Sequence, residues 1–162
     1  MKDLFAPWRM TVLEEYKKTN SCILCGIFKA KDDKEALIID RRKNSFLVMN
    51  KYPYANGHMM IVPNRHIGDW TKLTEEELLE MNLLSQEVIK VLGSSFQAQG
   101  YNMGVNLGRA AGAGIKEHVH MHIVPRWNGD FNFMPVLGEV RVISEHLEAT
   151  YEKFKKVWRT ES

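Results

Sequence analysis

The sequence predicts an α+β fold built on one antiparallel sheet. Three short apolar runs, at 36–40, 45–50 and 58–63, follow one another with only short polar links, and strands joined in this way usually pair antiparallel. A helix, two more strands and a final helix complete the chain. A doubly wound parallel sheet would need a helix between every pair of strands, and this chain does not supply them.

The first half of the chain can be assigned from its local patterns. Residues 1–20 are expected to form a short amphipathic helix or arm, and the polar stretch 29–35 predicts a loop. The polar residues 41–44 lie between two β-like runs and favour a hairpin. The turn-rich stretch 50–57 leads into the strand 58–63, which is apolar enough to be buried.

Two longer helices are expected in the second half. Thr74 and Glu77 form a capping box, and apolar residues keep helical spacing from there until Gly93. Ser144 can cap a last helix at 144–158. The residues that would line one side of that helix are Leu147, Tyr151, Phe154 and Trp158.

Length and composition indicate an ordinary globular protein. The chain has 162 residues, and we expect a single domain over 1–162 with its core in 20–150. The net charge of +2 is too small to argue for a nucleic-acid partner. The chain start lacks the apolar core of a secretory signal, and no apolar run approaches the ~20 residues that span a bilayer. These features predict a cytoplasmic protein with no membrane partner.

The histidines are clustered, with five of the six in two places. In the segment 117–126 they alternate with apolar residues, directly after the predicted strand 101–107 and a glycine-rich run. On a strand, a period of two places His118, His120 and His122 on one face, whereas a helix would scatter them over ~200°. A single buried histidine with a structural hydrogen bond would be unremarkable in itself. Three in a row would each require a partner, which favours a functional site.

A metal site is the alternative for this row, since H-x-H on a strand is a common ligand pair. Two neighbouring histidines can reach one ion, but the third lies about 13 Å from the first at ~3.3 Å per residue. One metal therefore cannot use all three. The glycine-rich run 108–114 can bring backbone N–H groups close to an anion, so the combination indicates chemistry at phosphorus.

The pattern at 118–124 resembles the signature of the histidine triad (HIT) superfamily of nucleotide hydrolases and transferases. The stretch 50–63 is similar to that family's nucleoside-binding strand-turn-strand. The runs 106–114 and 118–133 look most like the bacterial diadenosine tetraphosphate phosphorylase branch. The resemblance implies a five-stranded antiparallel sheet with a central helix and a C-terminal helix. It also implies a homodimer in which two such sheets join.

The resemblance also implies roles for particular residues. His120 falls at the nucleophile, which would attack the α-phosphorus of a nucleotide. His122 would contact the phosphoryl oxygens or the departing group, and His118 and His58 would complete the catalytic set. Substrate binding is expected of Asn50, Asn106, Gly112, Ala113, Gly114 and Trp127.

Some of these assignments leave alternatives open. Asn50 is the candidate for the ribose hydroxyls. Trp127, Phe131 and Phe133 are candidates to stack on a second nucleoside, with packing or a dimer contact as the alternative. Many triad proteins carry serine or threonine four residues before the first histidine, where this chain has Gly114. A hydroxyl contact to phosphate is therefore missing, which leaves the acceptor of the reaction open.

A second group of residues has the composition of a metal-binding site. Cys22 and Cys25 form a C-x-x-C, which in an intracellular protein is more often a metal clamp or a redox pair than a disulfide. With His66 and His118 they make a tetrahedral zinc set of structural type, similar to that of several triad proteins. The alternative is a reduced, metal-free pair near the surface, and a redox role lacks the βαβ context. We expect structural zinc and no organic cofactor.

The sequence therefore predicts a nucleotidyl transferase acting on a dinucleoside polyphosphate. The specific prediction is phosphorolysis of diadenosine tetraphosphate, with inorganic phosphate as acceptor. The runner-up is hydrolysis of dinucleoside polyphosphates or adenosine phosphoramidates, with water as acceptor. A hypothesis of another class is a non-catalytic nucleotide-binding or zinc-stabilised interaction module, and a metallohydrolase is a further alternative.

Overall fold

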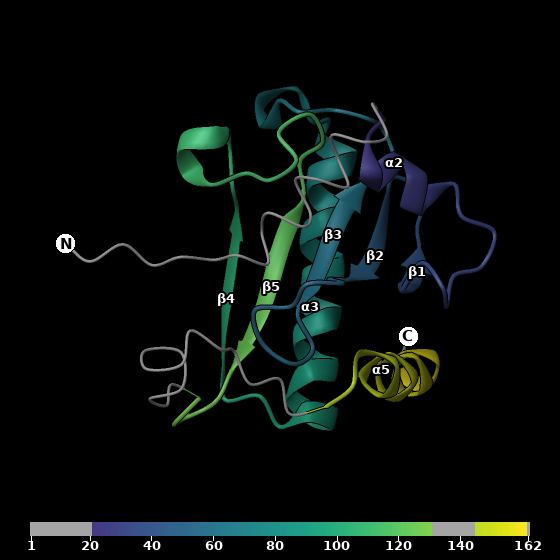
Figure 1. Ribbon diagram of the computed structural model, residues 1–162, viewed down its shortest axis with the longest axis vertical. Helices are drawn as coiled ribbons and strands as arrows, with labels where there is room; N and C mark the ends of the chain where they lie inside the picture. Colours follow the sequence, from purple (N-terminus) through teal and green to yellow (C-terminus); the bar gives the residue numbers. More distant parts are fainter. Residues whose placement is uncertain (1–20, 131–144, 162) are drawn as a thin grey trace.

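The fold is centred on a five-stranded sheet in the order β1-β2-β3-β5-β4 (Figure 1). This computed structural model describes residues 21–130 and 145–161. All of the described pairings are antiparallel, which confirms the predicted fold class. The strands are β1 (Ile38–Arg41), β2 (Ser45–Met49), β3 (Met59–Pro63), β4 (Gly100–Val105) and β5 (Met121–Arg126).

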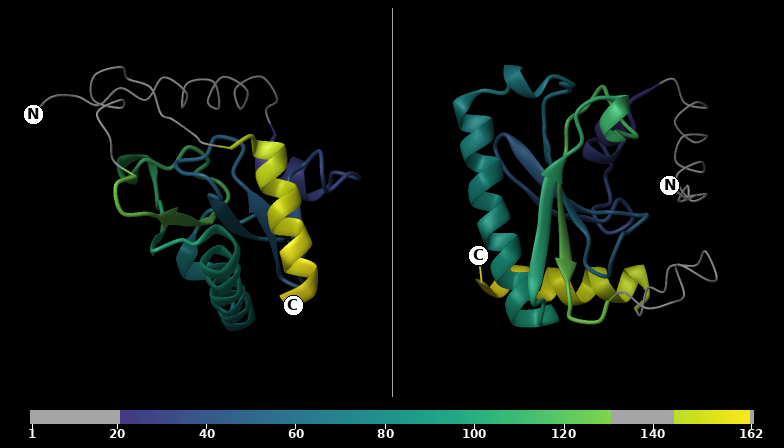
Figure 2. Two further views of the ribbon diagram at one scale, coloured as in Figure 1. Left: turned by 90° about the horizontal axis from the view of Figure 1, so that it is seen from below. Right: turned by 90° about the vertical axis from the view of Figure 1, so that its left-hand side faces the viewer.

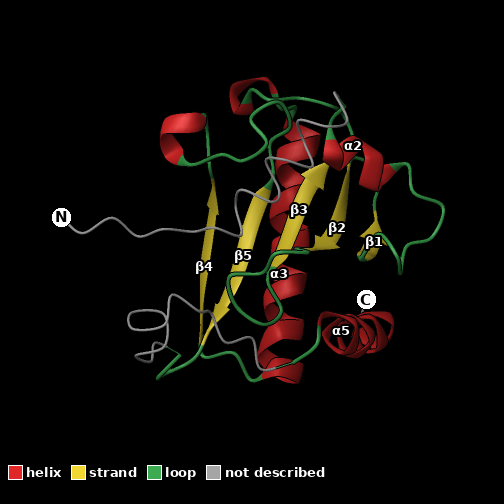
Figure 3. Cartoon of the chain, in the orientation of Figure 1, coloured by secondary structure: helices red, strands yellow, loops and turns green. Residues whose placement is uncertain are grey.

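Helices lie on both faces of this sheet (Figure 3). Figure 2 shows α3 along one face, α5 lying across at one end, and α2 on the opposite face from α3. The α5 helix packs against α3 and β1. The helices are α2 (Ile23–Phe28), α3 (Glu75–Phe96) and α5 (Leu147–Glu161), with 3₁₀ turns η1 (Trp70–Lys72) and η2 (Arg109–Ala111).

The centre of the sheet is buried on both faces: every residue of β2 and β3 is buried, and β2 sends alternate side chains to two apolar clusters. Leu47 and Met49 join the larger cluster, which fills the space between the sheet, α3 and α5. Phe46 and Val48 join the smaller cluster, which packs against α2 through Leu24. This two-sided burial explains why β2 and β3 appear in the sequence as nearly continuous apolar runs. No helix of the described residues is both long and apolar enough to cross a membrane.

The start of α3 is tied to the loop after β3. The predicted capping box is confirmed: Thr74 Oγ1 accepts from the Glu77 backbone N–H at 3.2 Å, and Glu77 accepts from the Thr74 backbone N–H at 2.9 Å. The Arg65 guanidinium also pairs with Glu77 at 2.8 Å and lowers the pKa of that carboxyl. The helix cap therefore anchors the turn that carries His66.

The predicted end of α3 at Gly93 is wrong, since the helix continues to Phe96. A methyl group at Gly93 would lie 3.1 Å from the Tyr101 hydroxyl, which donates to the Ile89 carbonyl at 3.2 Å. This glycine makes room for a β4 side chain rather than ending the helix. The helix stops where Gln97 adopts a left-handed conformation, with φ of 53°.

The α2 helix was not expected, because only six residues form it and the sequence offers no long periodic pattern. It buries Leu24 against the sheet and is followed by the predicted loop at 29–35. The last helix is confirmed, and Tyr151, Phe154 and Trp158 are buried as predicted. The expected arm at 1–20 and the Ser144 cap lie outside the described residues.

Candidate active site

The histidine row begins before its strand. The predicted strand covers 117–126, but the hydrogen-bonded ladder of β5 starts at Met121. The preceding segment joins the loop after β3 instead, where the Val119 backbone N–H donates to the Ile67 carbonyl at 2.7 Å. The predicted alternation still holds, since Val119, Met121 and Ile123 lie in the core cluster beside α3. The histidines between them point toward the other face.

His120 is held in one tautomer by its own chain. Its Nδ1 lies 2.9 Å from the His118 carbonyl oxygen, and a carbonyl can only accept. The hydrogen therefore sits on Nδ1, and Nε2 keeps its lone pair. Burial lowers the pKa of His120, while the hydrogen bond to the carbonyl opposes this shift. The result is an uncharged imidazole that lines the larger pocket.

A second pair of histidines forms a directed hydrogen-bond chain. The Tyr54 backbone N–H donates to His58 Nδ1 at 3.0 Å, so neutral His58 carries its hydrogen on Nε2. That nitrogen lies 2.9 Å from His122 Nδ1, which must then accept. Neutral His122 consequently carries its hydrogen on Nε2. The rings of His120 and His122 are neighbours, with centroids 4.8 Å apart, so the ring that keeps a lone pair on Nε2 packs beside the ring that carries a hydrogen on Nε2.

The larger pocket has a volume of about 690 Å³ and two chemically different sides. One side is mainly apolar and comes from α2, the sheet and the turn after β2. The other side is the connection between β4 and β5, which supplies Asn106, Gly112, Ala113 and Gly114, all predicted substrate-binding residues. The apolar and aromatic side chains of the first side are Ile23, Ile27, Ala36, Leu37, Met49, Tyr52, Tyr54 and Met60.

Asn50 also lines this pocket, as predicted. Its Oδ1 accepts from the Tyr52 backbone N–H at 2.8 Å, which stabilises the turn after β2. Its Nδ2 lies 3.4 Å from the Met60 sulfur, a weak acceptor. The amide is therefore positioned by the turn, with its nitrogen over an apolar part of the pocket.

Trp127 lies elsewhere. Its Nε1–H donates to the Phe96 carbonyl at 3.1 Å, and its ring packs against the core cluster beside α3. The described residues that line the two pockets do not include it. Phe131 and Phe133 lie outside the described residues, so a stacking role for this stretch stays a prediction.

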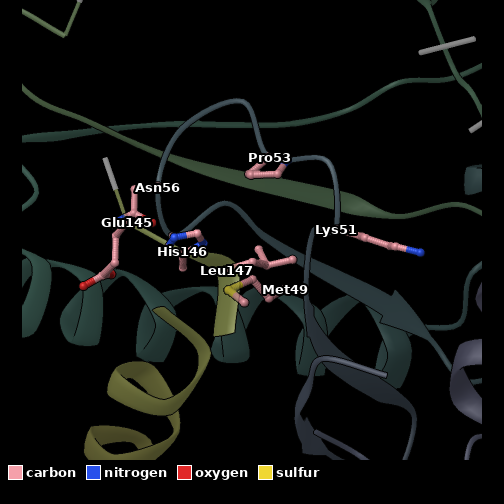
Figure 4. A pocket seen from close by; sticks show the side chains of 8 residues that line it. Met49, Lys51, Pro53, Asn56, Glu145, His146 and Leu147 are labelled. Carbon is pink, nitrogen blue, oxygen red and sulfur yellow. Dashed lines mark hydrogen bonds between the residues drawn. The ribbon is translucent and has the colours of Figure 1, made fainter. Parts of the chain in front are cut away.

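A smaller pocket of about 370 Å³ lies near the start of α5 (Figure 4). Its lining includes Glu145, whose pKa is lowered by hydrogen bonds from Thr150 and Asn56. His146, predicted to be exposed, lines this pocket and is indeed exposed. Met49 and Lys51 line both pockets, while none of the triad histidines borders the smaller one.

The four predicted zinc ligands lie together although they come from three distant segments. Their ligand atoms are all within 4.8 Å of one another. His118 Nε2 donates to the Pro63 carbonyl at 2.9 Å, which leaves the lone pair on Nδ1. That Nδ1 lies 3.4 Å from Cys22 Sγ and 3.5 Å from Cys25 Sγ, and His66 Nδ1 lies 3.3 Å from Cys25 Sγ.

The three nitrogen-to-sulfur separations fit coordination to a zinc ion. Tetrahedral coordination with Zn–S near 2.3 Å and Zn–N near 2.0–2.1 Å gives ligand-to-ligand distances of about 3.3–3.8 Å. The lone pair of His118 also faces the sulfurs, as coordination requires. Burial and the neighbouring Cys22 raise the pKa of the Cys25 thiol. A cation between the sulfurs would favour the thiolate form and replace that proton.

Sequence reasoning missed residues that act through the backbone. A methyl group at Gly68 would lie 2.6 Å from the Lys116 carbonyl oxygen, so only glycine lets the loop after β3 approach the segment before His118. Tyr54 contributes through its backbone N–H, a group that every residue except proline carries, so the sequence could not single it out.

The sequence analysis also did not assign Arg109 and Lys116 to the site, although both line the larger pocket. Their position in or beside the glycine-rich connection between β4 and β5 could have indicated this.

Several named proteins are similar to this chain in sequence. A protein called AP-4-A phosphorylase from Mycobacterium tuberculosis is 39% identical over 126 residues, covering 78% of this chain and 65% of its own length. This chain therefore spans just under two thirds of that relative. A bis(5'-adenosyl)-triphosphatase from Dictyostelium discoideum is 32% identical over 113 residues, covering 69% of this chain and 74% of the relative.

The fold is also found among solved structures. A Zn-bound histidine triad family protein from Mycobacterium smegmatis superposes with a TM-score of 0.69 at 24% identity, covering 87% of this chain and 95% of that one. The family model described as the HIT domain matches residues 31–129. This match covers more than half of the chain and includes the five clustered histidines, and the chain belongs to the HIT domain family.

Proposed function

We propose that this protein is a nucleotidyl transferase acting on dinucleoside polyphosphates through a covalent nucleotidyl-His120 intermediate, with phosphorolysis of diadenosine tetraphosphate as its reaction. The hydrogen bond from His120 Nδ1 to the His118 carbonyl carries this proposal, because it leaves a lone pair on Nε2 inside a pocket. The names of the two relatives, a phosphorylase and a triphosphatase of adenosine nucleotides, support the substrate class.

In the first step His120 Nε2 attacks the α-phosphorus. A P–N bond forms, the P–O bond to the bridging oxygen breaks, and its electron pair leaves with the rest of the polyphosphate. His122 donates its Nε2 hydrogen toward that departing oxygen, a contribution typically worth ~10²–10⁴ in rate. The His118 carbonyl accepts from Nδ1 and thereby stabilises the positive charge that develops on the His120 ring.

In the second step an oxygen of inorganic phosphate attacks the same phosphorus from the pocket. The P–N bond breaks, its electron pair returns to His120 Nε2, and a nucleoside diphosphate leaves. Diadenosine tetraphosphate would thus give ATP in the first step and ADP in the second. If water were the acceptor, the second product would be AMP.

The two sides of the pocket suit the two parts of a nucleotide. We assign the nucleoside to the apolar side, with Asn50 as the candidate for the ribose hydroxyls. Asn106 and the backbone N–H groups of Gly112, Ala113 and Gly114 are assigned to the phosphoryl oxygens, where fixed donors stabilise developing charge. This scheme needs no organic cofactor.

We further propose that Cys22, Cys25, His66 and His118 bind a structural zinc ion. The ion would supply a cross-link between the start of α2 and the segment before β5. The chain's own role in catalysis would be unchanged: His118 would still accept from His120 through its carbonyl. Coordination at His118 Nδ1 would restrict that residue and so position the carbonyl.

We also propose that the protein acts as a homodimer. Within the described residues β4 pairs only with β5 and forms an edge of the sheet. Met103 on this strand is 44% exposed, and Leu107, just after the strand ends, is 49% exposed. Exposed edge strands with apolar side chains favour pairing with a second chain. Light scattering after size exclusion would give a mass near twice 18.8 kDa if this is correct.

The decisive experiment is incubation with diadenosine tetraphosphate, with and without inorganic phosphate, followed by product identification. Phosphorolysis predicts ADP and ATP in equal amounts and only in the presence of phosphate. Formation of AMP and ATP irrespective of phosphate would make the enzyme a hydrolase with the same intermediate. Tight binding without any turnover would instead support the nucleotide-binding module.

A further inference from the structure

The charges around the larger pocket are unevenly distributed. Among its described lining residues the cations are Lys51, Arg109 and Lys116, and the only acid is Glu35. Two of the three cations lie on one short segment, the β4–β5 connection. That segment also contains the glycine run at 112–114, whose small residues leave the backbone accessible to a ligand.

The order of the strands indicates in which direction a nucleotide bound in the pocket would extend. In the order of neighbours β2-β3-β5-β4, His122 on β5 and His120 just before it lie between the apolar strands β2 and β3 and the strand β4 that leads into Arg109. Figure 1 shows the β4–β5 connection at the same end of the sheet as α2. A nucleotide with its base on the apolar side and its α-phosphate at His120 would therefore extend toward Arg109 and Lys116.

Both of these cations are available to a ligand. Within the described part of the chain no carboxylate lies within ion-pair distance of Arg109 or Lys116, and both side chains belong to exposed residues. Several arginines of the molecule are instead paired with carboxylates, as Arg42 is with Glu87 at 2.8 Å and Arg126 with Asp130 at 2.6 Å. Arg109 and Lys116 thus present two cationic groups beside the backbone N–H groups assigned to phosphate.

From this arrangement we propose that Arg109 and Lys116 determine specificity for the length of the phosphate chain. They bind the phosphates beyond the one attacked by His120, and so favour a dinucleoside tetraphosphate over a triphosphate or a short leaving group. This inference rests on the proposed function, because it needs the scissile phosphate to lie at His120. Each added phosphate carries a negative charge, and complementary charge adds binding energy only where that phosphate reaches the cations.

The test uses the full-length double variant Arg109→Gln with Lys116→Gln. The matched control is Lys90→Gln, which removes an exposed lysine on α3 outside both pockets. For each protein, kcat/KM is measured with diadenosine triphosphate, tetraphosphate and pentaphosphate, and with adenosine 5'-phosphoramidate, whose leaving group carries no phosphate. Thermal unfolding of both variants establishes that they are folded.

We expect the double variant to lose about tenfold in kcat/KM for the tetraphosphate, mostly through KM, and less than twofold for the phosphoramidate. The single variant Lys116→Arg keeps both cationic groups and should retain most of the preference for the tetraphosphate. An equal loss on all four substrates, or the same profile in Lys90→Gln, would overturn the inference. If the wild-type protein cleaves none of them, the proposed function fails first and this inference falls with it.

Discussion

Two histidines separated by one residue use opposite ring nitrogens. His118 donates from Nε2 to the Pro63 carbonyl at 2.9 Å and turns Nδ1 toward two cysteine sulfurs. His120 donates from Nδ1 to the His118 carbonyl, also at 2.9 Å, and keeps the lone pair on Nε2 at the pocket. In each ring a carbonyl fixes the hydrogen on one nitrogen, and the other nitrogen is left for chemistry.

Burial does not distinguish these two residues. The exposed fractions are 0% for His118 and 7% for His120, and burial lowers the pKa of both. What differs is which acceptor lies beside which nitrogen. One histidine is therefore suited to ligate a metal and the other to attack phosphorus. His118 also connects the candidate metal site with the candidate catalytic site. Its side chain faces the cysteines, while its carbonyl accepts the hydrogen bond from His120.

The largest effect on activity should come from removing the proposed nucleophile, the lone pair on His120 Nε2. His120→Gly is expected to lower turnover of diadenosine tetraphosphate by at least about 10³-fold, because no nucleophile remains to form the intermediate. Nucleotide binding, measured by calorimetry, and the thermal unfolding temperature should change little. Turnover within tenfold of wild type would contradict the covalent mechanism.

Disrupting the proposed zinc site should lower the thermal stability more than the rate of the reaction. Chelation, or Cys25→Ser, is expected to lower Tm by about 5–10 °C, because a bound metal stabilises only the folded state. The kcat of the remaining folded protein should fall less than in His120→Gly. Metal analysis and differential scanning calorimetry provide the measurements. Loss of activity at constant Tm, restored by added zinc, would instead indicate a metallohydrolase.

The sequence predicted the features of the site that depend only on residues close together in the chain. The period of two placed the histidines on one face, and the capping box located the start of α3, because both features require only neighbouring residues. The four residues predicted to bind zinc were grouped with the help of the resemblance to triad proteins, and the structure brings their candidate ligand atoms within 4.8 Å of one another.

The sequence did not show the tautomers, that is, which nitrogen of each ring carries the hydrogen and which backbone group holds it there. They depend on the carbonyls of Pro63 and His118 and on the backbone N–H of Tyr54, and backbone groups carry no residue-specific signal. The prediction that α3 ends at Gly93 was wrong for a related reason. This glycine leaves room for the Tyr101 hydroxyl, which belongs to a different strand and could not be placed from the sequence. A glycine needed for close approach resembles a glycine that ends a helix until the partner is known.

A smaller effect is expected from the residue that orients His122. His58→Phe keeps a ring against Tyr54, whose ring centroid lies 4.9 Å away, but removes the donor to His122 Nδ1. The hydrogen on His122 is then no longer directed to Nε2, so kcat should fall about tenfold to a hundredfold with little change in KM. The control His146→Ala removes an exposed histidine of the smaller pocket and should leave kcat unchanged. Equal kcat in both variants would exclude a positioning role for His58.

The pH dependence should show the smallest effect. Burial lowers the pKa of His118 and His120, so both rings stay neutral in the folded protein at pH values where a free imidazole, with pKa about 6.5, takes up a proton. The unfolded chain then binds more protons, and stability should be greatest above pH 6.5 and fall as the pH drops through the lowered values. The acid limb of kcat/KM should likewise lie below pH 6.5. A limb at or above pH 6.5 would mean that the titrating group is exposed, and that the buried nitrogen of His120 does not control the covalent step.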